Sequence, residues 1–184
     1  DNVTRAMTED GSFRLIATTV DRTSKDIAAA QHATDGQARQ LAELVMAAVL
    51  VRETSAPGKR VQVTLLTPST GSLVAESRPD GSCRGFINPG HEAPSPDRAL
   101  FQVAYHRRDG SLHQSTIAVA PSVAIAEALM EYLQTSEQII ATVELSSAGE
   151  AAEVHGAGYA VQMLPDPSAD AMRAMTEHLE GQPE

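Results

Sequence analysis

The sequence has no tryptophan and a single cysteine, Cys83, among its 184 residues. One cysteine excludes an internal disulfide, and it cannot by itself build a structural zinc site, which uses about four ligands. We therefore expect no metal and no other cofactor in this chain, and a reducing, cytoplasmic setting.

Basic residues and long apolar runs are also scarce. The chain has 14 Lys and Arg residues against 24 Asp and Glu residues, a formal net charge of -10. This charge would repel a nucleic-acid backbone, and the scattered basic residues form no stripe that offsets it. The longest apolar stretch, residues 41–51, contains Glu43 and is shorter than the roughly 20 residues of a membrane-spanning helix. We expect a soluble protein that binds neither nucleic acid nor membranes.

Three Asp-Gly-Ser tripeptides mark the turns of three expected β-hairpins. They begin at Asp10, Asp80 and Asp109, and each lies between runs rich in branched or aromatic residues. An Asp-Gly pair tolerates the positive φ that tight hairpin turns require. The expected strand pairs are 3–8 with 13–20, 72–76 with 83–87, and 100–106 with 112–119. Further strands are expected at 61–66, 139–145 and 156–165, and a proline-containing exposed loop at 88–97.

Helices are expected between these hairpins. Ser24 is placed to cap a short helix that ends near residues 35–36, Ser122 a third helix, and Ser168 a last helix that reaches about Leu179. The second helix, residues 37–52, is apolar on nearly all sides, which predicts that it lies buried between sheet layers. These patterns together predict one α+β domain, residues 1–184, with antiparallel sheet layers built from hairpins, a buried central helix and peripheral helices.

A polar cluster, residues 135–138, follows the third helix. Ser136 and Glu137 are candidate catalytic residues, but no Gly-flanked nucleophile elbow surrounds this serine. The better interpretation is structural, because short polar side chains satisfy the free backbone groups where a helix ends and a strand begins.

Six histidines raise the question of a metal site. His106 and His113 would face each other across a hairpin if Asp109 and Gly110 formed a two-residue turn, but a change of register by one residue would separate them. Two ligands do not complete a site, so we expect no metal. Cys83 has a neighbouring arginine that could lower its pKa, although a half-buried strand thiol is the commoner case.

The last helix carries an apolar stripe of Met172, Met175 and Leu179. Such a stripe is usually core. Because methionine adapts to partners of different shape, the stripe could instead form an adhesive surface if nothing covers it.

Four segments occur in a characteristic order: DNVTRAMTEDGSFRLIATTV, LVAESRPDGSCRGFINP, IAEALMEYLQTSEQI and GAGYAVQMLP. In this order and spacing they resemble the heat-shock protein 33 family, the redox-regulated 33-kDa chaperonins, over nearly the whole chain. The most specific positions are Tyr132, Ser136, Glu137, Gln138, Gly158, Gln162, Leu164 and Pro165. The resemblance implies an α+β core domain with two antiparallel sheet layers and a buried helix, in which the Ser-Glu-Gln turn is part of the framework.

The resemblance also implies a function. Family members are cytoplasmic stress-response chaperones that act without ATP as holdases: they bind unfolding or partly folded proteins, often as homodimers. They carry in addition a C-terminal zinc domain with four cysteines, C-x-C and C-x-x-C, which this sequence does not contain. We therefore expect no redox switch, and zinc only where such a domain is attached. The last helix, about 168–180, would correspond to the start of the family's linker, and the segment 88–100 is shorter than usual.

A holdase needs an exposed apolar surface and no reactive group. We expect the client-binding surface to include Phe101, Val103, Tyr105, Ile117, Val119, Met172 and Met175. Two alternatives stay open: an interaction or regulatory module without general client binding, and a small hydrolase. The hydrolase would need His106, His113 or Ser136 to converge with an acid in a pocket, and we expect that the chain is not an enzyme.

Overall fold

The computed structural model describes residues 1–55, 57–68, 71–106 and 110–180, and for residues 178–180 it describes the backbone alone. The described strands form two antiparallel sheets. The four-stranded sheet has the order β1 (Asn2–Met7), β2 (Phe13–Thr19), β9 (His155–Met163), β8 (Ala141–Ala148). The five-stranded sheet has the order β5 (Cys83–Asn88), β4 (Gly71–Ser77), β3 (Arg60–Thr67), β6 (Ala99–His106), β7 (Leu112–Val119).

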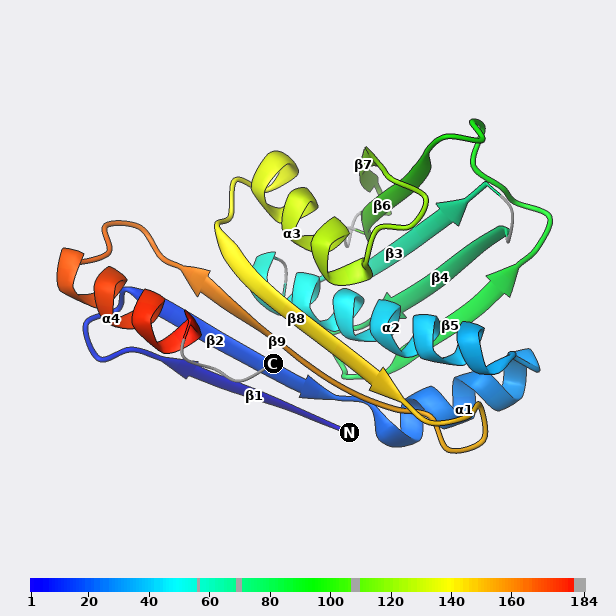
Figure 1. Cartoon of the computed structure of the whole chain (residues 1–184), viewed down its shortest axis with the longest axis horizontal. Coiled ribbons are helices and arrows are strands. Elements are labelled where there is room, and N and C mark those ends of the chain that lie inside the picture. The colour runs from blue at the N-terminus through cyan, green and yellow to red at the C-terminus, as the bar shows by residue number, and fades with distance from the viewer. Residues whose placement is uncertain (56, 69–70, 107–109, 181–184) are drawn as a thin grey trace.

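Helix α2 (Asp35–Ser55) lies between the two sheets and contacts strands of both (Figure 1). Its residues from Leu41 to Thr54 are buried, apart from a half-buried Glu43, which confirms the expected central helix. The helix begins two residues before the expected start. Thr34 and Gln37 explain the difference: the Thr34 amide donates to Gln37 Oε1 at 3.0 Å, and the Gln37 amide to Thr34 Oγ1 at 3.4 Å, which is a capping box.

The three hairpins are present as β1–β2, β4–β5 and β6–β7. In the first two, Gly11 and Gly81 have φ of 73° and 85°, as the Asp-Gly turns require. Asp10 and Asp80 fix these turns by accepting hydrogen bonds from the amides two residues further on, at 3.1 and 2.9 Å. In the third hairpin, Asp109 lies outside the described residues.

The remaining helices are α1 (Asp21–Gln31), α3 (Ile125–Ser136) and α4 (Ala169–Glu180). Ser24 does not cap α1; it lies inside the first turn, where its hydroxyl donates to the backbone carbonyl of Asp21 at 3.0 Å. Ser122 does not cap α3 either, because the residue before the helix is Ala124, with no side-chain cap. Ser168 does cap α4, since its Oγ accepts a hydrogen bond from the Ala171 amide at 3.1 Å.

The architecture is α+β, as predicted from the hairpin turns and the all-apolar helix. Each sheet turns one face toward α2, and α3 packs beside β8 and reaches β6 and β7. No helix among the described residues is long and apolar enough to cross a membrane.

Candidate functional site

The β6–β7 part of the expected client-binding surface is not a surface. Phe101, Val103, Tyr105 and Val119 are between 0% and 4% exposed, and Ile117 is half-buried against the same core. These residues alternate along their strands and point to the face that α2 and α3 cover. The prediction that they form an open apolar patch is therefore wrong: their branched and aromatic character serves the core.

The described residues leave the outer face of the four-stranded sheet, which is the face turned away from α2, largely uncovered. In β2, Ile16 and Thr18 are buried toward α2, so that Leu15, Ala17 and Thr19 point outward. Leu15 is 37% exposed. The outward-facing set is Asn2, Thr4, Ala6, Leu15, Ala17, Thr19, Thr142, Glu144, Ser146, Ala157, Tyr159 and Val161. Glu144 is the one charged member of this set, so the outer face is close to neutral.

A shallow hollow of about 390 Å³ lies on this outer face. Ala17 and Tyr159, which are cross-strand partners on β2 and β9, form part of its lining. Gly158 contributes its backbone at the same place, and a Cβ atom there would lie 2.7 Å from Leu145 Cδ2 and 2.9 Å from the carbonyl oxygen of Glu144. This Cβ would point to the inner face, because Gly158 pairs with the inward-pointing Thr18 and the Cβ would lie 3.4 Å from Met46 Sδ of α2. Gly158 therefore allows the close approach of β9 to β8 and α2 behind the hollow.

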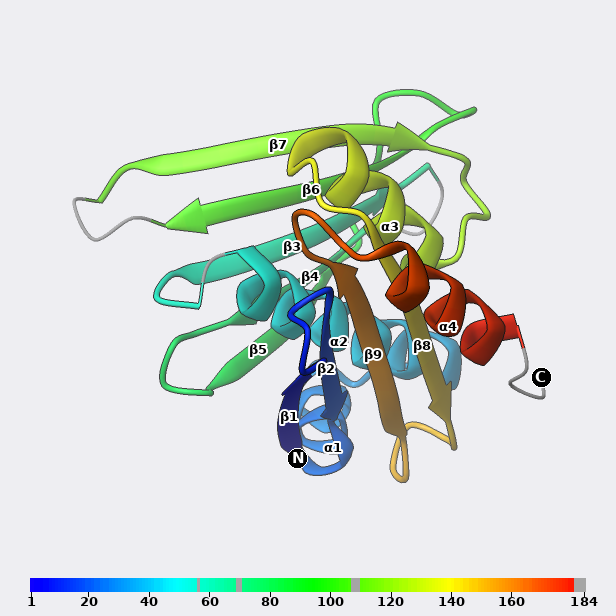
Figure 2. The same cartoon turned by 90° about the vertical axis from the view of Figure 1, so that its left-hand side faces the viewer.

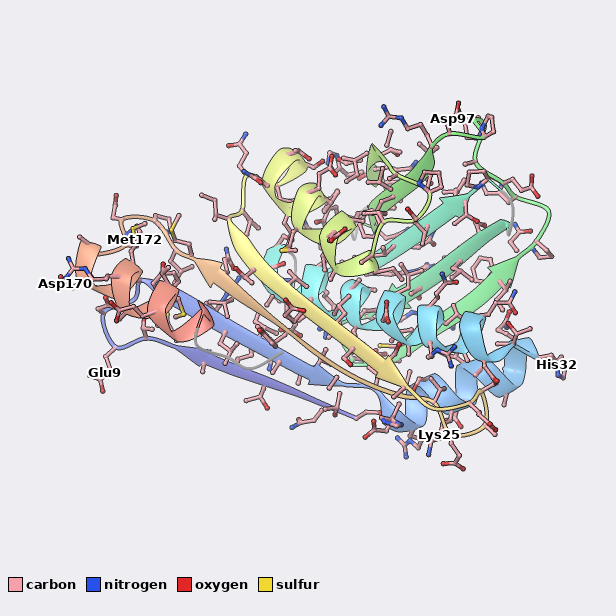
Figure 3. The ribbon with its side chains drawn as sticks, viewed as in Figure 1. Glu9, Lys25, His32, Asp97, Asp170 and Met172 are labelled. Carbon is pink, nitrogen blue, oxygen red and sulfur yellow. The ribbon has the colours of Figure 1, made fainter. Side chains whose placement is uncertain are left out.

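Helix α4 covers one end of the same outer face (Figure 2). Met172 and Met175 line a groove of about 170 Å³ together with Phe13, Val161 and Met163 of the sheet. Met172 is 45% exposed and lies in the first turn of α4, where Figure 3 labels it. The methionine stripe is therefore partly packed and partly open, and it continues the apolar outer face. The Leu179 side chain lies outside the described residues.

The polar cluster after α3 holds two buried tyrosines. Oε1 of Glu137 accepts hydrogen bonds from the Tyr132 hydroxyl at 2.5 Å and from the Tyr105 hydroxyl at 2.9 Å. Burial raises the pKa of Tyr105 to about 12, and burial together with the Glu137 hydrogen bond raises that of Tyr132 further. Both hydroxyls therefore stay protonated and act as donors, and the cluster ties α3 to β6.

The other members of the family pattern also make framework contacts. Gln162 Oε1 accepts a hydrogen bond of 2.5 Å from Arg14 Nη2, which also donates to the carbonyl of Thr54 at 2.7 Å. The Leu164 amide donates to the carbonyl of Ser12. Pro165 follows beyond the end of β9, outside the sheet. Gln138 has a φ of 57° and turns the chain from α3 into β8.

No catalytic constellation forms among the described residues. Ser136 is the exposed last residue of α3. His113 pairs with Tyr105 and His106 with Leu112, so the two histidines point to opposite faces of the sheet. The condition for their facing each other is therefore not met, and the structure has the change of register by one residue that separates them. The part of the chain that the structure describes holds no group of three or more potential metal ligands.

Cys83 is a half-buried strand thiol. Burial raises its pKa, against a weaker opposing effect of the hydrogen bond to Ser77 at 3.8 Å. The neighbouring Arg84 is exposed, because successive strand residues point to opposite faces. The thiol is thus less prone to ionise than a free cysteine, and this environment is that of a packing residue.

Two antiparallel sheets packed on either side of a buried helix define an α+β core domain of the two-layer kind that the four sequence segments imply. A family model described as Hsp33 protein matches residues 1–183, and the chain belongs to the Hsp33 family. Among solved structures, the chain resembles the 33 kDa chaperonin, a heat shock protein 33 homologue, of Thermotoga maritima. The TM-score is 0.75 and the identity 18%, and the match covers 99% of this chain and 68% of that one. No curated protein matches the chain.

Hsp33 is a family of chaperones, so membership supports a chaperone function and fits a protein that is not an enzyme. The sequence pattern of β6 and β7 was interpreted as an exposed apolar surface, whereas these residues are buried or half-buried. The alternation in β2 and β9 could have indicated the outer face, because residues such as Ala17 and Tyr159 alternate there with buried residues. The acceptor role of Glu137 had no such signal, because Tyr105 is far from it in the sequence.

Proposed function

We propose that this chain is an ATP-independent holdase whose client-binding surface is the outer face of the four-stranded sheet, extended at one end by Met172 and Met175. The observation that supports the proposal is the hollow over Ala17 and Tyr159, on a face that, within the described part of the chain, has α4 over one end and no other helix. An apolar face that remains uncovered in a folded chain marks an interaction site.

The chemistry of this face suits unfolded partners. A holdase must accept many sequences, so its surface should offer apolar area without a fixed pattern of charges. The outer face offers alanine, leucine and tyrosine side chains between threonines, and methionines at its edge adapt to clients of different shape. The net charge of -10 on the chain keeps such a protein in solution while the face stays nearly neutral.

Regulation by oxidation is not expected in this chain. Cys83 is the one cysteine in the sequence, and it is half-buried with a raised pKa. A thiol switch of the family's four-cysteine kind has no counterpart here. We propose that the outer face binds clients equally under reducing and oxidising conditions, in the cytoplasm and without zinc.

The test is light scattering of a thermally aggregating client enzyme, with the chain added at near-stoichiometric amounts. Wild type should suppress scattering in both reducing and oxidising buffer. The variant Leu15→Lys/Ala157→Lys places two charges on the outer face and should lose most of the suppression. The matched control Gln40→Lys/Gln134→Lys adds the same charge at exposed positions of α2 and α3 and should behave as wild type.

Two results would overturn the proposal. Equal suppression by wild type and the Leu15→Lys/Ala157→Lys variant would move client binding away from this face. Absence of suppression for unrelated clients, together with selective binding of one partner, would favour an interaction module that keeps the fold.

A further inference from the structure

The two sheets have four edge strands, which differ in how far other elements or charged side chains cover them. A bare edge strand presents unpaired backbone amides and carbonyls to any passing chain, so folded proteins protect such edges with charges, short strands or covering elements. The edges here are β1 and β8 of the four-stranded sheet and β5 and β7 of the five-stranded sheet.

Two of these edges have a helix beside them, and a third is short and carries a charge. The outer edge of β5 is met by α1: Gln31 Oε1 accepts a hydrogen bond of 3.1 Å from the Ile87 amide, and β5 carries the exposed Arg84. Strand β8 carries the exposed Glu144 and has α3 packed beside it. Strand β1 is short and carries Arg5, whose side chain is ion-paired with Glu53 at 2.6 Å.

Strand β7 lacks all of these devices. Its eight residues, LHQSTIAV, include no charge, no proline and no glycine. Leu112, which begins the strand, is 53% exposed. Within the described part of the chain, the backbone groups of β7 that point away from β6 have no hydrogen-bond partner. Figure 2 shows α3 on the inner face of this sheet, while the far edge of β7 runs uncovered over most of its length.

We propose that the free edge of β7 is a second binding site, which takes an extended, uncharged stretch of an unfolding polypeptide as an added β-strand. Main-chain hydrogen bonds supply the affinity in this mode of recognition, and side chains supply little sequence preference. That property suits a protein that receives many different clients. The inference rests on the proposed function for the source of such segments, but it uses a different sheet and a different kind of contact.

Charge favours an extended segment over a second copy of this chain. Each copy carries a net charge of -10, so two folded copies that meet edge to edge repel each other. Strand β7 carries no cation that would offset this repulsion. An extended segment brings backbone amides and carbonyls that complement those of β7 and brings no such repulsion. Its neutral side chains would lie beside Gln114 and Thr116, which are exposed on the outward side of the strand.

The probe is a fluorescently labelled, acetylated peptide of eight alternating threonine and valine residues, matched to the length of β7. Its affinity for wild type is measured by fluorescence anisotropy and compared with that of the same peptide N-methylated at two adjacent central residues. Adjacent methyl groups remove a donor from each edge of the peptide strand. Whichever edge faces β7, one hydrogen bond to the strand is then lost and a methyl group is pressed against β7, which should weaken binding by about tenfold or more.

Proline variants test the site on the protein. Ser115→Pro and Thr116→Pro are made as two separate variants. One of these two amides donates to β6, and the other points away from β6 toward the free edge. Proline is tolerated in an edge strand where its missing amide faces solvent. The variant that keeps the wild-type melting transition should bind the unmethylated peptide about tenfold more weakly. If neither variant folds, the comparison of methylated and unmethylated peptides on wild type decides.

Each outcome has a separate meaning. Equal binding of both peptides, or full peptide affinity in the folded proline variant, would overturn the proposal. A concentration-dependent dimer in sedimentation that the folded proline variant abolishes, without peptide binding to wild type, would assign the edge to a second copy and also overturn it. The Leu15→Lys/Ala157→Lys variant should bind the peptide normally, so that failure of the proposed outer face and failure of the β7 edge are distinguishable.

Discussion

The hydroxyl of Tyr132 donates a hydrogen bond of 2.5 Å to Oε1 of Glu137, at the turn where α3 ends. The Tyr105 hydroxyl of β6 donates to the same oxygen at 2.9 Å, and Ser55 at the end of α2 lies 3.3 Å from that hydroxyl. One carboxylate thus joins α3, the five-stranded sheet and the central helix. Because the Tyr132 side chain is fully buried, its hydroxyl has no water to replace this acceptor.

Replacing Glu137 should therefore destabilise the fold. Glu137→Ala removes the acceptor that both tyrosine hydroxyls share and leaves the buried Tyr132 hydroxyl only its long, 3.4 Å contact with the Tyr105 hydroxyl. It should lower the free energy of unfolding by about 2 kcal/mol, whereas Glu137→Gln keeps an acceptor oxygen and should cost less. Urea denaturation measures both. The control is Ser136→Ala, an exposed neighbour, which should stay within about 0.5 kcal/mol of wild type. A Glu137→Ala variant as stable as wild type would show that the cluster does not support the fold.

Local sequence predicted one part of the Glu137 cluster and not the other. The polar run 135–138 predicted a helix-to-strand junction, and the structure has one, with the Glu137 and Ile139 amides both donating to the carbonyl of Leu133. The tyrosine contact could not be predicted from the sequence, because Tyr105 reaches Glu137 through tertiary packing. Likewise, the hairpin turns follow from Asp-Gly chemistry, which is local, whereas the exposed sheet face follows from how two distant strands pair.

The buried patch of Phe101 and Val103 makes the same point. Alternation identified one face of β6 as apolar, but an apolar face is buried or open depending on which helix covers it. The all-apolar sequence of α2 predicted that this helix lies between sheets. It did not predict which face of β6 and β7 turns toward the helices, so the apolar face of these strands was interpreted as open although it is buried.

Gly158 should be hard to replace. A Cβ atom at this position would lie 2.7 Å from Leu145 Cδ2 and 2.9 Å from the carbonyl oxygen of Glu144, and the backbone oxygen cannot give way cheaply. Gly158→Ala should lower the free energy of unfolding by about 1–3 kcal/mol through overpacking. Gly36→Ala, in the first turn of α2 with open space around its position, should instead be neutral or stabilise by about 0.5 kcal/mol. Thermal and urea unfolding of both variants check the contrast, which equal effects would contradict.

Glu76 should make the stability depend on pH in the acid range. Its burial alone would raise its pKa, but hydrogen bonds and charge from Arg78, at 2.6 Å, and Arg60 outweigh this, and the pKa is lowered. A group with a lowered folded-state pKa stabilises above its unfolded-state pKa, about 4.3, and this contribution is lost as the pH falls through the folded-state value.

Glu76→Gln should thus be less stable than wild type at pH 7, by on the order of 1 kcal/mol because both arginines are partly exposed. The difference should narrow as the pH falls below about 4. Urea unfolding at a series of pH values measures it. Glu127→Gln, at an exposed position of α3, controls for the loss of one surface charge. A Glu76→Gln deficit that stays constant down to pH 3 would contradict the assignment.

Helix α4 should be the least protected helix of the fold. Among the described residues it is the one helix that makes no close backbone approach to another element, and it is held by the Met172 and Met175 side chains and by its N-terminus. There, Ser168 caps the helix, and its amide donates to Ser12 Oγ at 3.3 Å. By contrast, α3 buries Leu129 and Leu133 completely. Local opening of α4 therefore needs little loss of buried area.

Hydrogen exchange followed by mass spectrometry should show faster exchange in α4 than in α3. Ser168→Ala removes a cap worth about 1 kcal/mol and should speed exchange in α4 about fivefold. Ser122→Ala is the matched control: its position before α3 suggests a cap, but no side-chain cap exists there, so exchange in α3 should not change. Equal protection of the two helices, or an α4 that does not respond to Ser168→Ala, would mean that α4 is fixed by more than its cap and its two methionines. In that case the outer face of the four-stranded sheet would be permanently covered at this end, and clients could reach it only over the hollow at Ala17 and Tyr159.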